Sequence, residues 1–177
     1  MEPIRIAWGV GRGPTRLSAY DAALAEAGVH DYNLRQLSSV IPAGATVEEV
    51  GTVPDLGPGG QGLHVVEASA VGRNGPQTAV LAWARSPDGP GLFYEAGASE
   101  PSSAVVEEVL TGIDAGIDLR DRPYGEPRTR VVTVDAAEGH VSERAAGVAD
   151  GGSSGVPDEP YAAAVAIAAY GRSEPLL

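Results

Sequence analysis

Short apolar runs, separated by glycine and proline, constrain the fold of this chain more than any other feature. The 177 residues include 24 glycines and 14 prolines. Short runs rich in β-branched and aromatic residues, bounded by such turn formers, are typical of β-strands. A chain of this length is most simply one domain. We therefore expect an α+β fold of a single domain, residues 1–177, in which strands are in the majority.

Two stretches have the composition of helices. Residues 16–27 contain good helix formers with apolar positions on one face, and Gly28 follows them as a plausible C-cap. Residues 101–116 predict a second helix, for which Ser102 or Ser103 is available as the N-cap. The apolar face of the first helix is expected to comprise Leu17, Tyr20, Leu24 and Ala27.

The remaining apolar runs predict strands. Residues 161–170 are ambiguous, because their alanine content favours a helix while their length also permits a buried strand. Residues 51–62 are expected to be a loop, and residues 139–160, which are polar and rich in Gly, Ser and Asp, an exposed loop. The predicted strands cover residues 3–8, 32–41, 63–71, 78–85, 91–97 and 129–135.

A glycine-rich stretch at residues 9–14 has the position of a dinucleotide-binding turn, between a strand and a helix. Such a turn requires a third glycine at a fixed spacing. Pro14 stands there in one register and Arg16 in the other, and no βαβ pattern follows. We therefore interpret this stretch as a plain turn.

The balance of charge excludes several functions. There are 24 acidic and 12 basic residues, a net charge of −12, and all the basic residues are arginine. Such a charge repels phosphate backbones, so nucleic acid is not an expected partner. Without lysine there is no lysine Schiff base with pyridoxal phosphate, and the absence of cysteine excludes thiolate metal sites. The acidic surface suits a salt-rich cytoplasm, although a GC-rich genome would also replace lysine by arginine.

No metal site or membrane segment is expected. His30, His64 and His140 are far apart, without the spacing of paired ligands. The first residues lack a basic region followed by a long apolar run, which would mark a signal peptide. We therefore expect a cytoplasmic protein.

The serine pair Ser38–Ser39 lies between apolar residues and precedes Val-Ile-Pro. An isolated pair of this kind is most simply part of a turn. A buried turn can also hold a peptide bond under strain, and strained backbone is used in chemistry. The Ser39 hydroxyl would then be placed to attack the carbonyl carbon of Ser38. Both readings remain open from the residues alone.

Several motifs together resemble the pyruvoyl-dependent arginine decarboxylases. They are Leu-Ser-Ala-Tyr-Asp at residues 17–21, Asn33-Leu34, Leu-Ser-Ser-Val-Ile-Pro at residues 37–42, and Gly-Leu-Phe-Tyr-Glu at residues 91–95. The alanine-rich segment with aromatic ends near the C-terminus is a weaker match. The resemblance covers residues 5–170, and the serine motif is its most specific part.

The resemblance implies a self-processing enzyme without pyridoxal phosphate or metal. Cleavage between Ser38 and Ser39 would leave fragments 1–38 and 39–177, with a pyruvoyl group made from Ser39. This group would form a Schiff base with L-arginine and allow CO₂ to leave, giving agmatine. The implied fold is an αββα sandwich, assembled as a trimer of processed protomers. The implied roles are oxyanion donor for Asn33, proton donor for Glu95, guanidinium partner for Asp21, and contacts to the substrate chain for Leu17 and Tyr32.

Two alternatives remain. A related pyruvoyl enzyme could decarboxylate another amino acid, since one aspartate does not by itself distinguish arginine from other cations. A paralogue that does not process itself could bind a cationic amine without catalysis. The presence of both serines together with Asn33 and Glu95 speaks against the second alternative.

Overall fold

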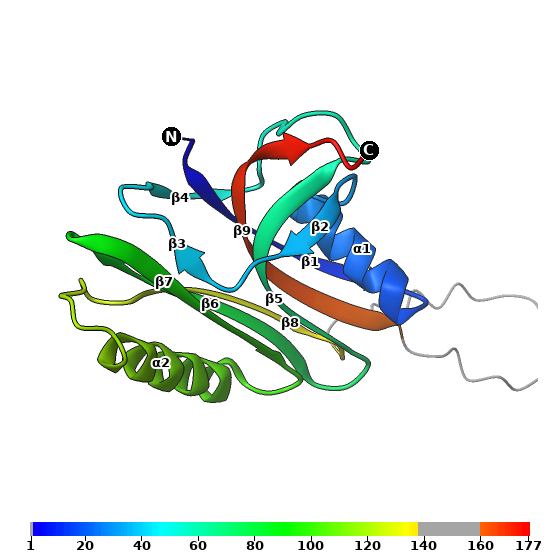
Figure 1. Ribbon diagram of the computed structural model, residues 1–177. Coiled ribbons are helices and arrows are strands. Elements are labelled where there is room, and N and C mark those ends of the chain that lie inside the picture. Colours follow the sequence, from blue (N-terminus) through cyan, green and yellow to red (C-terminus); the bar gives the residue numbers. More distant parts are fainter. Residues whose placement is uncertain (1, 138–159) are drawn as a thin grey trace, which may run out of the picture.

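Two β-sheets pack face to face, and one helix covers the outer face of each (Figure 1). The structure is a computed structural model that describes residues 2–137 and 160–177. The five-stranded sheet has the order β2 (Asn33–Gln36), β5 (Gly62–Gly72), β9 (Tyr161–Glu174), β1 (Ile4–Gly13), β4 (Val47–Gly51). The four-stranded sheet has the order β3 (Val40–Ile41), β7 (Gly89–Ala98), β6 (Pro76–Ser86), β8 (Arg128–Asp135). The helices are α1 (Arg16–Ala27) on the first sheet and α2 (Ser102–Asp118) on the second. The expected α+β class with a strand majority is confirmed.

The ambiguous segment near the C-terminus is a strand, β9, at the centre of the larger sheet. It pairs antiparallel with β1 on one side and β5 on the other. Its residues are buried on both faces: Ala164, Ala166 and Ala168 face the core between the sheets, and Val165 and Ile167 face the core under α1. Burial on both faces removes the alternation that identifies a half-buried strand, and the sequence was ambiguous for this reason.

The glycines of residues 9–14 belong to a strand, so their interpretation as a turn was wrong. β1 continues to Gly13, and α1 packs directly on it. A Cβ at Gly9 would lie 2.2 Å from the carbonyl oxygen of Ala23, and one at Gly11 would lie 2.3 Å from that of Ala19. Glycine is therefore required on this face because the helix backbone approaches so closely.

The helix α1 has the predicted bounds, but a different buried face. Its C-cap Gly28 has φ 83°, the left-handed conformation that glycine adopts without strain. Leu17 is 74% exposed, so the predicted apolar face is not buried throughout. The close packing against the strand glycines admits alanine better than leucine. The buried residues are Ala19, Ala23, Leu24 and Ala27.

The helix α2 fits the four-stranded sheet through two glycines of its own. A Cβ at Gly112 would lie 2.9 Å from the Tyr94 ring, and one at Gly116 would lie 2.5 Å from its hydroxyl. The Tyr94 ring on β7 therefore occupies the space that side chains would need, and the end of α2 lies close to that strand. The N-cap is Pro101, with no side-chain hydrogen bond, so the prediction of a serine cap was wrong.

The other predictions of secondary structure have mixed outcomes. The strands predicted at residues 63–71, 78–85, 91–97 and 129–135 lie within β5, β6, β7 and β8. Residues 32–41 form two strands on either side of the serine pair, as expected, and β4 was not predicted. The loop predicted at residues 139–160 falls almost wholly outside the described residues. Within the described residues, no helix is long and apolar enough to span a membrane.

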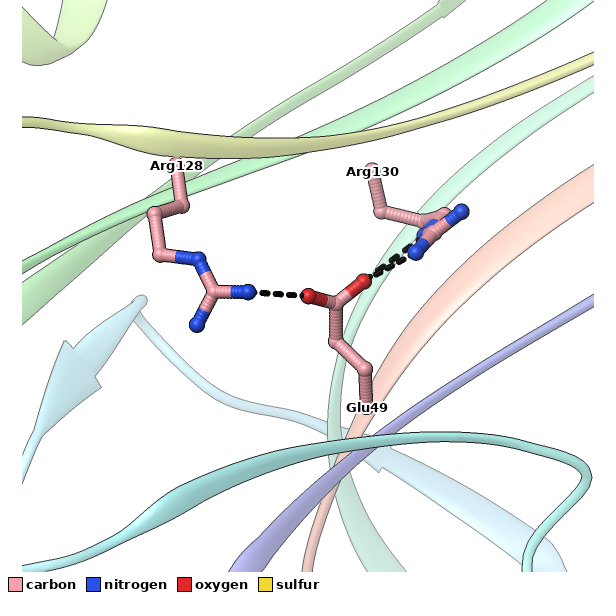
Figure 2. A network of polar contacts seen from close by, with 3 residues as sticks. All are labelled: Glu49, Arg128 and Arg130. Atoms are coloured by element: carbon pink, nitrogen blue, oxygen red, sulfur yellow. Dashed lines mark hydrogen bonds and ion pairs between the residues drawn. The ribbon is translucent and has the colours of Figure 1, made fainter.

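One acidic side chain connects the edges of the two sheets (Figure 2). Glu49 lies on β4, and its carboxylate accepts hydrogen bonds from two arginines of β8: Arg128 Nη2 at 2.6 Å and Arg130 Nε at 3.1 Å. The Arg130 guanidinium lies 3.9 Å from the centre of the Trp8 ring, and Arg128 lies 5.2 Å from that of Trp83. We call Glu49, Arg128 and Arg130 the Glu49 bridge.

Candidate active site

A pocket of about 380 Å³ opens beside β7, at the point where β3 begins. The two strands pair only through Val40 with Leu92 and Ile41 with Gly91, so β3 leaves the further part of this edge of β7 uncovered. The serine pair lies at that point, immediately before β3. The residues that line the pocket are Ser38, Ser39, Leu92, Phe93, Tyr94, Glu95 and Arg120.

The backbone of Ser39 is held in an unusual conformation. Its φ is 64°, and among the described residues it is the one non-glycine residue with a positive φ. The Phe93 amide donates a hydrogen bond to the Ser39 carbonyl at 2.8 Å, and the Tyr170 hydroxyl donates one to the next carbonyl, of Val40, at 3.0 Å. A left-handed serine costs of order 1–3 kcal/mol, so these bonds hold strain at the expected scissile position. The turn is more open than expected, since Ser38 is exposed and Ser39 half-buried.

The Ser39 hydroxyl donates to the Glu95 carboxylate. Its Oγ lies 2.8 Å from Oε1 and 3.0 Å from Oε2 of Glu95. Burial raises the pKa of Glu95, while the hydrogen bond from Ser39 lowers it to a smaller extent. Glu95 can therefore accept a proton from Ser39 Oγ, and once protonated it retains that proton to a higher pH than an ordinary carboxyl.

Tyr170, on β9, contacts two residues next to the serine pair and Glu95, and sequence reasoning did not assign it a role. Its ring packs edge-on against Phe93, with centroids 6.2 Å apart. Burial and the nearby Glu95 charge both raise the pKa of Tyr170, so its hydroxyl stays protonated and donates to Val40. The sequence marks Tyr170 only as the aromatic end of the alanine-rich segment. Its contact with Val40, 130 positions away, is formed by the tertiary fold and could not be predicted from nearby residues.

Arg120 lines the pocket, and sequence reasoning did not assign it a role either. It follows the end of α2, and its Nη1 donates to the Gly116 carbonyl at 2.6 Å. Glu95, in the same pocket, accepts hydrogen bonds from Ser39 and not from Arg120. Among the described residues, no carboxylate pairs with Arg120.

Asn33 and Tyr32, both predicted as site residues, do not line this pocket. The Asn33 amide donates to the Gly60 carbonyl at 2.6 Å. The Tyr32 hydroxyl donates to the Gly57 carbonyl at 3.1 Å and accepts from the Leu56 amide at 3.2 Å. Both side chains therefore hold the loop between β4 and β5, and their predicted catalytic and binding roles stay predictions.

Asp21 and Leu17 lie together in a second pocket, of about 440 Å³. Thr15 and Ser18 complete its lining, and we call it the Asp21 pocket. It shares no residue with the first pocket, which we call the Ser39 pocket. Thr15 is the N-cap of α1 and forms a reciprocal capping box with Ser18, which fixes this end of the helix. The result is an exposed carboxylate beside an exposed aliphatic side chain.

A metal centre has no counterpart within the described residues, where no three His, Asp or Glu side chains are grouped to hold an ion. His30 lies 3.7 Å from Asp31, with side chains 44% and 76% exposed. His140 lies outside the described residues.

Comparison with known proteins finds relatives over almost the whole chain. A family described as "Pyruvoyl-dependent arginine decarboxylase (PvlArgDC)" matches residues 3–175. Proteins named pyruvoyl-dependent arginine decarboxylase from two strains of Halobacterium salinarum are 49% identical over 99% of this chain and 98% of their own length. One of the same name from Methanopyrus kandleri is 35% identical over 80% of this chain and 89% of its length.

Proposed function

The chain belongs to the pyruvoyl-dependent arginine decarboxylase family, and from this we infer that it converts L-arginine to agmatine and CO₂ with a pyruvoyl group as its electrophile. The observation that carries the assignment of the site is the Ser39–Glu95 contact at a strained serine. The lack of lysine fits a decarboxylase whose carbonyl comes from elsewhere than pyridoxal phosphate.

We propose that the pyruvoyl group comes from Ser39 by self-cleavage. The Ser39 hydroxyl gives its proton to Glu95 and attacks the Ser38 carbonyl carbon, so that the amide becomes an ester. In this shift the C–N bond between Ser38 and Ser39 breaks, and the nitrogen of residue 39 takes up a proton. Elimination then removes the Cα proton of residue 39 and breaks its Cβ–Oγ bond, which releases Ser38 as a new C-terminal carboxylate and leaves dehydroalanine. Addition of water then releases ammonia and leaves the ketone. The left-handed Ser39 and the hydrogen bond from its hydroxyl to Glu95 support this course.

The residues around Ser39 fit a pyruvoyl group at this position. The Phe93 amide would continue to hold the carbonyl of residue 39, and Tyr170 that of Val40, because neither hydrogen bond involves an atom lost in cleavage. When present, the group supplies a ketone that binds the substrate amine as an imine and accepts electrons as CO₂ leaves. Glu95, with its raised pKa, holds the proton that replaces the carboxylate at the substrate Cα.

We further propose that Asp21 pairs with the guanidinium of the substrate, while Leu17 contacts its aliphatic part. Carboxylate and guanidinium match as a planar, two-pronged pair. Since the Asp21 pocket and the Ser39 pocket share no residue, the site would be completed in a trimer, with the Asp21 pocket of one protomer against the Ser39 pocket of its neighbour.

The cytoplasm of a cell rich in salt is the environment we propose for the enzyme. Its −12 charge per protomer would be concentrated in a trimer, and salt at about 1 M shortens the Debye length to about 3 Å. Unfolding measured at low and at molar salt tests this, and equal stability in both would contradict it.

Intact mass under denaturing conditions, together with detection of agmatine, tests the proposed function. We expect fragments of 38 and 139 residues (177 − 38 = 139), the larger with a blocked N-terminus, and release of CO₂ from arginine. An uncut chain in active protein would refute the cleavage. Cleavage without turnover of arginine would favour a relative with another amino acid as substrate. The absence of both cleavage and turnover would indicate an amine-binding paralogue.

A further inference from the structure

We infer that Arg120 binds the α-carboxylate of the amino acid substrate in the Ser39 pocket. This inference rests on the proposed function, because it assumes that an amino acid reacts at Ser39. It assigns a binding role to a residue outside the motifs that identify the family in this sequence.

The position of Arg120 is set by the packing of α2 on β7. Gly112 and Gly116 leave room for the Tyr94 ring, which brings the C-terminal end of the helix next to the strand that carries Glu95. Arg120 follows that end directly, and its backbone amide donates to the Ile117 carbonyl at 2.9 Å. Arg120 thereby lines the same pocket as Ser38 and Ser39.

One side of the guanidinium is anchored and the rest remains available. Nη1 donates to the Gly116 carbonyl, in the last turn of α2, where the helix dipole favours a cation. A guanidinium carries five N–H donors, so most of them are still unused by this bond. No carboxylate among the described residues forms an ion pair with Arg120, although Glu95 lines the same pocket.

The substrate supplies the missing anion. An amino acid bound by its α-amine at position 39 brings its carboxylate into the pocket that Arg120 lines. Arg120 would hold this carboxylate about equally in the bound substrate and in the transition state, and the interaction is lost only when CO₂ leaves the site. Arg120 should therefore strengthen the binding of the substrate but not that of the product amine, which helps the product to leave.

Cleavage creates a second carboxylate in the same pocket, at the new C-terminus of Ser38. A guanidinium that bound this group instead would shape the site for substrate and product alike. The two sources of carboxylate can be separated with ligands, because only arginine carries the α-carboxylate, whereas agmatine and argininamide do not.

The test compares Arg120→Gln with Arg122→Gln, which removes the same charge two positions away from an exposed residue that does not line the pocket. Both variants should be cleaved completely by intact mass. Arg120→Gln should raise the arginine KM about 10- to 100-fold, the effect of a lost charge-assisted hydrogen bond, and change kcat less than about threefold. The affinities for agmatine and argininamide, measured by calorimetry on the processed protein, should stay within about twofold, since these ligands lack the group that is bound.

Several results would overturn the inference. Parallel losses of arginine and agmatine affinity would assign Arg120 to the Ser38 carboxylate, and incomplete cleavage would assign it to maturation. An unchanged arginine KM would show that it binds no substrate group. Arg120→Lys, which keeps the charge but not the planar fork, should show a smaller rise in KM and replaces the Gln variant where that protein does not accumulate. Decarboxylation of arginine by the wild-type protein tests the proposed function separately.

Discussion

Two groups of Glu and Arg side chains in this molecule are arranged in opposite ways. In the Glu49 bridge, both carboxylate oxygens of Glu49 are taken by arginines from the other sheet (Figure 2). In the Ser39 pocket, Glu95 and Arg120 line one cavity, yet Glu95 is bonded to a serine and Arg120 to a helix carbonyl. The bridge uses its charges to hold two sheet edges together, while the pocket leaves its charges available.

The difference has a direct chemical consequence for Glu95. A guanidinium beside a carboxylate favours its ionised form and lowers its pKa. The pKa of Glu95 is raised by burial instead, so the group remains able to hold a proton and donate it. Pairing Glu95 as Glu49 is paired would stabilise the pocket but remove that ability.

Removal of the Ser39 hydroxyl should have the largest effect. Ser39→Ala leaves no oxygen to attack Ser38 and no donor to Glu95, so we expect one uncut chain and no decarboxylation. Intact mass and agmatine formation measure this, with Ser103→Ala, an exposed serine at the start of α2, as the control that should be cut normally. Cleavage of the Ser39→Ala chain at the same bond would show that another group is the nucleophile.

Replacement of Glu95 should have the next largest effect. Glu95→Gln cannot supply the proton, and the loss of general acid catalysis should lower kcat about 10²- to 10⁴-fold. It should also slow cleavage, because the amide does not accept the Ser39 proton as a carboxylate does. Glu107→Gln, on the exposed side of α2, is the matched control. A loss under about threefold would reduce Glu95 to a structural role.

The raised pKa of Glu95 also predicts opposite pH dependences for the two steps. If Glu95 is the proton donor, decarboxylation requires its protonated form, and kcat should fall as the pH rises through the pKa of Glu95. Cleavage requires the ionised form to accept the Ser39 proton, so its rate should rise over the same range. Cleavage removes the Ser39 hydroxyl, whose hydrogen bond lowers this pKa, and the fall in kcat should therefore lie at higher pH than the rise in cleavage rate. Rates of both steps, measured across this range, would contradict the assignment if they moved in the same direction.

Asp21 resembles Arg120 in that it forms no ion pair with any described residue. If it pairs with the substrate guanidinium, Asp21→Asn should raise the arginine KM about 10- to 100-fold, the effect expected for a hydrogen bond between charged groups. Self-cleavage should continue, because the Ser39 pocket does not contain Asp21. Asp114→Asn, exposed on α2, is the control. Normal kinetics for the Asp21 variant, or equal turnover of arginine and uncharged citrulline, would place the specificity elsewhere.

Local features of the sequence predicted much of this fold. The helix formers before Gly28 set the bounds of α1, and apolar runs located β5 to β8. The failures lie where distant segments decide the outcome. The glycines of β1 are part of a strand because α1 packs on them, and β9 lacks alternation because it is buried on both faces.

The site shows the same division between local and distant information. The motif around Ser39 and the strand around Glu95 were recognisable, although 56 positions separate the two residues. Tyr170 and Arg120 were missed because only the packing of β9 and α2 brings them to the serine pair. The Glu49 bridge was missed for the same reason, since its arginines lie 79 and 81 positions from Glu49.

The Glu49 bridge should show the smallest effect, on stability alone. Glu49→Gln removes the charge shared by two arginines and leaves them next to each other without it. Because the Arg128 side chain is 64% exposed and that of Arg130 is 32% exposed, solvent compensates part of the loss, and we expect a cost of about 1–2 kcal/mol. For a chain of this size the melting temperature should fall by roughly 2–8 °C, and by less in molar salt, where charges are screened. Thermal unfolding at one protein concentration measures this, with Glu48→Gln, exposed on the same strand, as the control. Arginine kinetics should not change, since the bridge and the Ser39 pocket share no residue. A loss of activity without a loss of stability would mean that the bridge acts on the site, and the two groups of charges would then not be separate.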